Sequence, residues 1–287
     1  MSERLTKVEF TNLDKILYSK LKITKAQVIQ YYIRIAPRML PLLERHPLVM
    51  TRFPNGIEAE GFYEKDAPLG TPPWVQTFRT YSDSAQRELR YVLCNNLYTL
   101  VWLANLAALE IHMTLSRADS FEIPNLVFFD VDPEPPATYE NAVDVVLLLK
   151  EKLDDLSLIS FVKTSGLKGL HVVLPIVEDH TFKETRNFVH QIARGLVKES
   201  EIMVSEYAQS KKSGTVFIDY RQNSHGRTMI CPYSLRATQT ATISMPLKWD
   251  DVKKRLKPEE FTLFSVGKFT IDPWKSLFDN RQRLKVM

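Results

Sequence analysis

Cysteine is scarce in this sequence, because its 287 residues include only Cys94 and Cys231. Two distant cysteines supply neither a disulfide framework nor a zinc knuckle, so we expect a reducing compartment. Long apolar runs are also missing. The longest, over residues 97–109, contains an asparagine and is too short to span a bilayer, and the start MSERLTKVEF lacks the apolar segment of a signal peptide. We therefore expect neither export nor a membrane span.

A strong charge of either sign is absent as well. The 38 Lys and Arg residues against 34 Asp and Glu give a net charge of +4, with a pI near 8.9. A polyanionic partner is therefore permitted but not required. The hydrophobic content of 44% and charged content of 25% are typical of a globular protein. Because no repeat, low-complexity tract or linker divides the chain, we interpret residues 1–287 as a single domain with two modules, about 1–124 and 125–287.

The first module is predicted to contain two helices. Thr24 begins a capping-box pattern in front of a helix over residues 25–44, which its two internal prolines are expected to kink or segment. The apolar segment 97–111 is predicted to be a buried helix with His112 at its end.

Strands are predicted between these helices. Residues 48–53 and 57–65 are strand-like and flank a Pro-Asn-Gly turn, which predicts a hairpin. Residues 67–84 are rich in Pro, Gly, Thr and Ser, and we expect a loop there apart from a short strand over 74–78.

The second module shows a regular order of elements. We predict strand 125–131, helix 139–155, strand 158–163, strand 170–176, helix 181–200 and strand 215–220. This β-α-β-β-α-β order is the split βαβ, or ferredoxin-like, plan of RNA-recognition modules and several polymerase palms. The fold class is therefore α+β. A short helix is expected near 248–256.

Acidic residues end two of these strands. Asp130 and Asp132 lie two apart at the end of an apolar strand, so their side chains share a face, and Asp219 closes the strand VFIDY. Acidic pairs at strand ends are also common as solvated turn residues. Three converging carboxylates, however, suit two hard ions, Mg²⁺ or Mn²⁺, in a site for phosphoryl transfer.

A glycine turn follows in the sequence SGLKGLH. Ser165, Lys168 and His171 accompany two glycines there, and such a turn can direct backbone N–H groups and a cation at an anion. Glycine turns also join many strands without any ligand. Taken alone, a histidine such as His112 is more often a capping or satisfied core residue, and an arginine such as Arg236 is more often an ordinary rim cation than a phosphate clamp.

Several motifs together resemble a known family. They are NLDKILY, ITKAQVIQYY, TRFPNG, EGFYEKDAP, LVWLANLAALEIHMTLSR, VFFDVDP, VKTSGLKGLHVVLPI, FIDYRQNSHGRTMICPYSLRA and DPW. In collinear order over nearly the whole chain, they resemble the polymerase domain of bacterial DNA ligase D and its stand-alone archaeal relatives. These proteins belong to the archaeo-eukaryotic primase superfamily and act in non-homologous end joining.

The resemblance implies roles for individual residues. The catalytic, metal-binding carboxylates would be Asp130, Asp132 and Asp219. The incoming triphosphate would be held by His112, Ser165, Lys168, His171, Gln222 and Arg236. DNA would be bound by Lys15 and Lys25 at a downstream 5′-phosphate, by Phe62 and Tyr63 at the templating base, and by Arg52. Tyr63 stands where relatives more often have a second Phe, and Gln222 where some have Arg.

The implied activity is that of a metal-dependent nucleotidyltransferase using two Mn²⁺ or Mg²⁺ ions. It would extend DNA 3′ ends from nucleoside triphosphates, with a preference for ribonucleotides, and fill short gaps at breaks that carry a 5′-phosphate. A separate DNA ligase and a Ku-like protein would be its partners, and a prokaryotic cytoplasm, at the nucleoid, its location. Two alternatives stay open: a metal-dependent nuclease or phosphohydrolase using the same acids, and a non-catalytic nucleic-acid-binding module.

Overall fold

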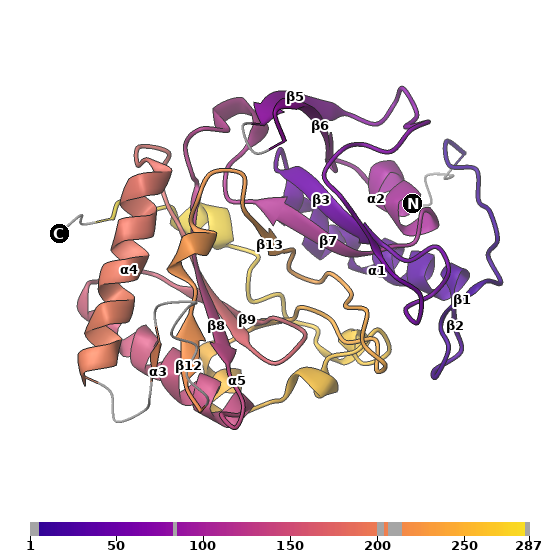
Figure 1. Cartoon of the computed structure of the whole chain (residues 1–287). Helices are drawn as coiled ribbons and strands as arrows, with labels where there is room; N and C mark the ends of the chain where they lie inside the picture. Colours follow the sequence, from indigo (N-terminus) through magenta and orange to yellow (C-terminus); the bar gives the residue numbers. More distant parts are fainter. Residues whose placement is uncertain (1–5, 83–84, 200–203, 206–213, 285–287) are drawn as a thin grey trace.

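The computed structural model describes residues 6–82, 85–199, 204–205 and 214–284. Two six-stranded sheets lie side by side, and a two-stranded ribbon accompanies the first (Figure 1). The helices are α1 (Lys25–Leu43), α2 (Leu97–Asn105), α3 (Tyr139–Asp155), α4 (Phe182–Glu199) and α5 (Trp249–Lys253). No described helix combines the length and apolar character needed to cross a membrane.

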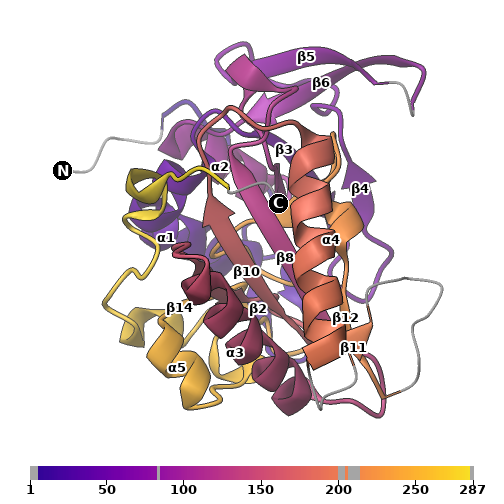
Figure 2. The ribbon, with the colours of Figure 1, turned by 90° about the vertical axis from the view of Figure 1, so that its left-hand side faces the viewer.

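The C-terminal sheet has the strand order β11-β12-β8-β10-β9-β14. Its strands are β8 (Leu126–Pro133), β9 (Phe161–Thr164), β10 (Leu170–Pro175), β11 (Val204–Ser205), β12 (Val216–Ile218) and β14 (Pro246–Leu247). Helices α3 and α4 cover one face of this sheet (Figure 2). The predicted β-α-β-β-α-β order and the α+β class are confirmed, and β8 lies between β12 and β10 as expected for a split βαβ unit.

The N-terminal sheet has the order β13-β7-β3-β6-β5, and β4 pairs with β3. Its strands are β3 (Pro47–Arg52), β4 (Phe62–Glu64), β5 (Thr77–Ser82), β6 (Arg87–Leu93), β7 (Ala108–Thr114) and β13 (Thr228–Ile230). The ribbon consists of β1 (Ile16–Tyr18) and β2 (Ile23–Thr24). All pairings within this sheet are antiparallel, which allows short connections between neighbouring strands.

The chain crosses between the two sheets more than once. After β12 it returns to the N-terminal sheet as β13, which pairs with β7, and then goes back as β14, which pairs with β9. One hydrophobic cluster of buried residues consequently includes side chains from both sheets, such as Leu48 of β3 and Val172 of β10. The segment that carries Arg236 is therefore held between the sheets.

The predicted helix over 97–111 is wrong in its second half. Helix α2 ends at Asn105, Ala107 adopts a left-handed backbone with φ of +58°, and the chain continues as β7. An apolar run buried on all sides has no helical or strand period, so its pattern does not separate the two structures. His112 consequently lies within a sheet strand instead of at a helix end.

The other first-module predictions are partly correct. The capping box of Thr24 and Gln27 is confirmed, but α1 is one continuous helix that contains both prolines, because its buried face packs into the core. In the predicted hairpin, β4 pairs with β3 but is only three residues long. Within residues 67–82 the strand is β5, shifted from the predicted 74–78, and its partner β6 was not predicted. Residues 83–84 of the predicted loop lie outside the described residues.

Candidate active site

Strand β8 carries the two neighbouring acids on the sheet face that the helices leave uncovered. Phe129 contacts Phe188 of α4, so odd-numbered residues of β8 face the helices and even-numbered residues face the other way. Asp130 and Asp132 are both partly buried on that second face. They line a cavity of about 200 Å³ together with side chains from the neighbouring elements, including His112, His171 and Arg236.

The SGLKG turn joins β9 to β10 beside these acids. Ser165 Oγ accepts hydrogen bonds from the backbone N–H groups of Leu167 (3.2 Å) and Gly169 (3.1 Å). Gly166 has φ of +75°, which a side chain would strain. Lys168 is half exposed, and its Nζ lies 3.2 Å from Glu134 Oε1, just beyond β8. The serine hydroxyl thus organises the turn, and the lysine extends from it toward solvent beside the acids.

Gly169 allows an unusually close approach between β10 and β8. A Cβ atom at this position would lie 2.2 Å from Asp132 Oδ1 and 2.4 Å from the Val131 carbonyl oxygen. Only glycine fits such a contact without moving the neighbouring strand. The second glycine of the motif therefore places the turn directly against the carboxylate of Asp132.

His171 is buried beneath the cavity and is held on both sides. Its Nε2 lies 3.1 Å from Asp130 Oδ1, and its Nδ1 lies 2.7 Å from Lys163 Nζ. Its ring meets Phe128 edge-on, with the centroids 4.7 Å apart. Burial, and next the charge of Lys163, holds the pKa of His171 well below its usual range, so the ring is neutral near pH ~7.

The N-terminal sheet contributes His112 and Glu110 from β7 to the same region. His112 Nε2 lies 3.7 Å from Glu110 Oε2, and Arg236 Nε lies 3.3 Å from Glu110 Oε1. Although burial opposes ionisation of Glu110, the interaction with His112 and the Arg236 charge outweigh it and lower the pKa of this carboxyl. Burial lowers the pKa of His112. One ionised carboxylate thus lies between two candidate triphosphate ligands.

Asp219 follows β12 and lies next to Asp130 across the strand pair, since its backbone N–H donates to the Asp130 carbonyl over 3.0 Å. Its carboxylate accepts from the backbone N–H of Arg221 (3.1 Å) and from Gln222 Nε2 (3.1 Å), as the cap of a short 3₁₀ turn. Asn223 fastens this turn to β8 through both backbone groups of Phe128, at 2.9 and 2.6 Å.

Carboxylate oxygens are the donors that hard divalent ions prefer, so these three acids are suitable ligands by chemistry. Among the residues that the structure describes, no group of three or more His, Cys, Asp or Glu side chains already forms a metal site. Asp130 and Asp132 share one cavity, whereas Asp219 does not line it and holds the 3₁₀ turn.

The two lysines of the predicted phosphate site lie close together at the far end of the N-terminal module. Lys25 is only 5% exposed, and its Nζ donates to Thr11 Oγ1 (3.2 Å) and to the Asn105 carbonyl (3.0 Å). Lys15 Nζ donates to Asn55 Oδ1 over 3.0 Å. Burial, and then the neighbouring Lys15, lowers the pKa of Lys25.

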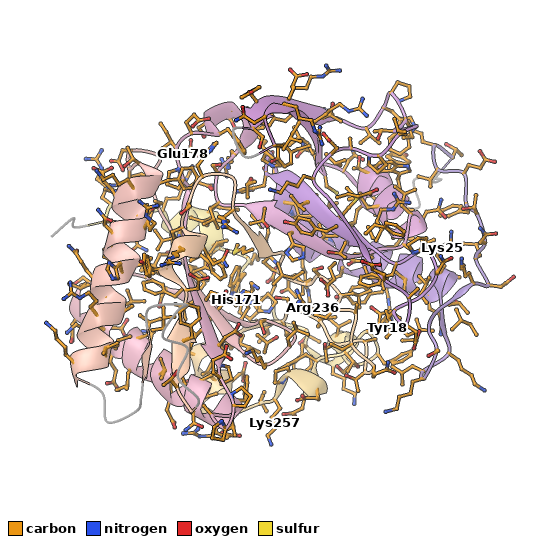
Figure 3. The ribbon with its side chains drawn as sticks, viewed as in Figure 1. Tyr18, Lys25, His171, Glu178, Arg236 and Lys257 are labelled. Carbon is orange, nitrogen blue, oxygen red and sulfur yellow. The ribbon has the colours of Figure 1, made fainter. Side chains whose placement is uncertain are left out.

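This lysine pair is separated from the acids but connected to the cavity. Lys15 directly precedes β1, and the Tyr18 hydroxyl of β1 donates to the Arg236 carbonyl over 3.0 Å. Figure 3 shows His171, Arg236, Tyr18 and Lys25 in succession from the C-terminal toward the N-terminal side of the molecule.

The aromatic pair of β4 is exposed, not part of the core. Phe62 is 55% and Tyr63 57% exposed on this short edge strand, and the Tyr63 ring lies edge-on to that of His112, with the centroids 6.4 Å apart. Tyr63 lines a larger cavity of about 720 Å³, which shares His112 and Gln222 with the acid-lined cavity. Arg52 of β3 is partly buried and binds both carboxylate oxygens of Glu64, at 3.1 and 3.0 Å. It therefore braces β4, the strand that carries the aromatics.

Sequence reasoning missed two charged residues of this region, Lys163 and Glu110. Each left a signal, because Lys163 is a charged residue in an otherwise uncharged strand and Glu110 lies two residues before His112 on one strand face. Neither signal was distinctive without the strand pairing.

Comparison with known proteins identifies the family. A family model described as the LigD primase-polymerase domain matches residues 24–274. The chain belongs to the LigD primase-polymerase domain family. This family consists of nucleotidyltransferases with polymerase activity that depend on divalent metal ions, so the predicted enzyme class and the predicted resemblance are confirmed.

Individual relatives agree with the family assignment. The chain is 34% identical over 262 residues to the bifunctional non-homologous end joining protein LigD of Bacillus subtilis, and 32% identical over 253 residues to the multifunctional LigD of Mycolicibacterium smegmatis. These matches cover 91% and 87% of this chain but only 42% and 33% of the two relatives. The chain thus spans less than half the length of these LigD proteins.

A solved structure is also similar. The polymerase domain of Mycobacterium tuberculosis ligase D, determined in complex with DNA, matches with a TM-score of 0.87 at 27% identity. The match covers 96% of this chain and 99% of that one. The LigD polymerase fold, expected from the sequence motifs, is therefore confirmed.

Proposed function

We propose that this LigD primase-polymerase domain extends DNA 3′ ends from nucleoside triphosphates and fills short gaps at double-strand breaks during non-homologous end joining. The observation that carries the proposal is the contact between Asp132 and Gly169. It puts a pair of carboxylates directly beside a lysine-bearing glycine turn, in one cavity that also contains His112, His171 and Arg236. Acids alone suit hydrolysis as well as transfer, but acids beside a cluster of cations suit a polyphosphate substrate.

The acids are proposed to hold the metal. Asp130, Asp132 and Asp219 would be the ligands, and their oxygen donors suit two Mg²⁺ or Mn²⁺ ions better than zinc. When bound, such ions neutralise the charge that develops during phosphoryl transfer. The protein would hold these carboxylates in position for the ions. The close approach at Gly169 packs the turn against Asp132, and His171 contacts Asp130.

Six residues are proposed to hold the incoming triphosphate: His112, Ser165, Lys168, His171, Gln222 and Arg236. Lys168 is half exposed, and its ammonium group pairs with the carboxylate of Glu134. A triphosphate carries more charge than Glu134 and would compete for this ammonium. Arg236 forms an ion pair with Glu110, with 3.3 Å between Nε and Oε1, which keeps its guanidinium beside the cavity.

The N-terminal module is proposed to bind the DNA. Lys15 and Lys25 would hold the 5′-phosphate on the downstream side of a gap, since two neighbouring ammonium groups suit a dianion. Phe62 and Tyr63 would stack on the templating base, and their exposure supports this role. For Arg52 we propose a contact with the same strand in addition to its pairing with Glu64.

We propose further that residues 1–287 act as one catalytic domain, which the shared hydrophobic cluster supports. We also propose a preference for ribonucleotides, a separate DNA ligase and a Ku-like protein as partners, and a location in a prokaryotic cytoplasm at the nucleoid; membership of the family supports these proposals. The DNA of the Mycobacterium tuberculosis complex supports nucleic acid as the partner.

One assay tests the proposed function against its alternatives. A labelled primer on a template, with and without a 5′-phosphorylated downstream strand, is incubated with Mn²⁺ or Mg²⁺ and each NTP or dNTP. We expect the primer to lengthen. A shortened primer would indicate a nuclease, and a shifted but unchanged primer a binding module.

The Asp130→Asn and Asp219→Asn variants should lose extension while DNA binding, measured by fluorescence anisotropy, stays within about twofold of wild type. Asp250→Asn in α5, an exposed acid far from the cavity, is the matched control and should extend normally. Retained extension in either site variant would refute the carboxylate assignment.

A further inference from the structure

Lys163 of β9 is fully buried and has no role in the function proposed above. The strand pairing places Lys163 opposite His171, and His171 opposite Asp130. Directly paired residues of neighbouring strands extend on the same face. The three side chains therefore form a row across β9, β10 and β8, which ends at an acid of the cavity.

The row is connected by hydrogen bonds. Lys163 Nζ lies 2.7 Å from His171 Nδ1 and 2.7 Å from Ser244 Oγ, and His171 Nε2 lies 3.1 Å from Asp130 Oδ1. A buried ammonium or amine is expensive unless its donors are satisfied. A lysine kept in such a place therefore has its role in these contacts, since a hydrophobic residue of similar length would fill the same volume.

The two ends of the row constrain the directions of its hydrogen bonds. The Ser244 hydroxyl donates to the Thr164 carbonyl over 2.8 Å, so its oxygen accepts from Lys163. At the other end the carboxylate of Asp130 only accepts, so His171 Nε2 carries a proton and donates it. With that proton on Nε2, we take Nδ1 as the acceptor of an N–H of Lys163, because the two nitrogens lie 2.7 Å apart and Nζ carries N–H donors in either charge state.

We propose that Lys163 is a positioning residue, which donates to His171 Nδ1 and thereby fixes the tautomer and ring orientation in which Nε2–H points at Asp130. Ring flipping would exchange a donor for a carbon at Asp130, and the Lys163 contact prevents it. The catalytic consequence rests on the proposed function of Asp130, whereas the hydrogen-bond arrangement itself does not. Removing such an outer partner of a catalytic ligand typically costs about 10–100-fold in activity.

The experiment is a ¹⁵N NMR measurement on protein labelled in its histidine rings, at one pH and without added metal. Wild type should show His171 as the Nε2–H tautomer with a hydrogen-bonded Nδ1. In Lys163→Met the Nδ1 resonance should shift to that of a free acceptor. In Lys163→Gln, whose amide keeps an N–H donor without the charge, the wild-type pattern should be largely restored. His46, buried in the N-terminal module, is the internal control and should not change.

Turnover is measured on the same variants by primer extension. We expect kcat to fall about 10–100-fold in Lys163→Met, to recover in part in Lys163→Gln, and primer-template affinity to stay unchanged. Unchanged ring resonances of His171 in Lys163→Met would overturn the proposal, and so would changed resonances with normal kcat. If Lys163→Met does not fold, Ser244→Ala takes its place, because it removes the second hydrogen-bond partner of Lys163. This variant should shift the same His171 resonances, and unshifted resonances would overturn the proposal.

The spectra also separate this proposal from the proposed function. If wild-type protein extends no primer, the polymerase proposal fails, while the His171 resonances still decide the role of Lys163.

Discussion

The contact between Gly169 and Asp132 provides a quantitative test of the site, through the variant Gly169→Ala. The added Cβ would lie 2.4 Å from the Val131 carbonyl oxygen, and real Cβ atoms essentially never come within 3.0 Å of such an atom. Backbone oxygen has no rotamer to adopt, so β8 and β10 must separate by at least the missing 0.6 Å. Overpacking of this kind costs about 1–3 kcal/mol, which lowers the Tm by about 2–12 °C in a domain of this size.

The same substitution should affect activity more than stability. Because the Cβ would also lie 2.2 Å from Asp132 Oδ1, the carboxylate has to leave its present position. Extension should therefore fall by at least about tenfold at a temperature where the variant is fully folded, because small displacements of catalytic groups are costly.

The assays are calorimetry for the Tm and primer extension for the rate. Gly267→Ala is the matched control, since a Cβ there meets nothing within 4 Å, and both its Tm and its rate should equal those of wild type. A Gly169→Ala protein that melts and extends like the Gly267→Ala control would refute the close packing of the turn against Asp132.

Three further predictions concern charge and stacking. Replacing both Lys15 and Lys25 by Ala should abolish the preference for gaps with a 5′-phosphate. In wild type this preference should weaken with rising pH already below the ordinary lysine range, because burial and then Lys15 lower the pKa of Lys25. Binding titrations at a series of pH values measure both effects. Burial lowers the pKa of Lys163 well below its usual value. Between the folded and unfolded pKa values the unfolded chain therefore binds more protons, and the free energy of unfolding rises with pH. Urea unfolding at a series of pH values should show this rise in wild type and not in Lys163→Met, and an equal rise in both proteins would contradict the prediction. Phe62→Ala and Tyr63→Ala should each weaken template binding by about 1–3 kcal/mol without lowering the Tm, since both rings are exposed; a lowered Tm with normal binding would show a packing role instead.

The sequence by itself determined the local chemistry of the site. The alternation in FDVD puts two acids on one strand face, the glycines of SGLKG predict a tight turn, and the capping box at Thr24 marks a helix start that the structure confirms. These features depend on neighbours within a few residues, so periodicity and turn chemistry are sufficient to predict them. The collinear motifs also identified the family and, with it, the fold.

Tertiary structure decided which of these residues meet. Within the row, Lys163 and His171 belong to one hairpin, whereas His171 meets Asp130 only through the register of two strands about 40 residues apart, which no local pattern specifies. Likewise, the apolar run after residue 105 becomes a strand because the N-terminal sheet takes it up as β7, and only that pairing brings His112 and Glu110 to the acids of the other sheet. The sequence therefore supplied the acids, the turn and the two histidines, while the pairing of distant strands placed His171 beside Asp130 and brought His112 to the same cavity.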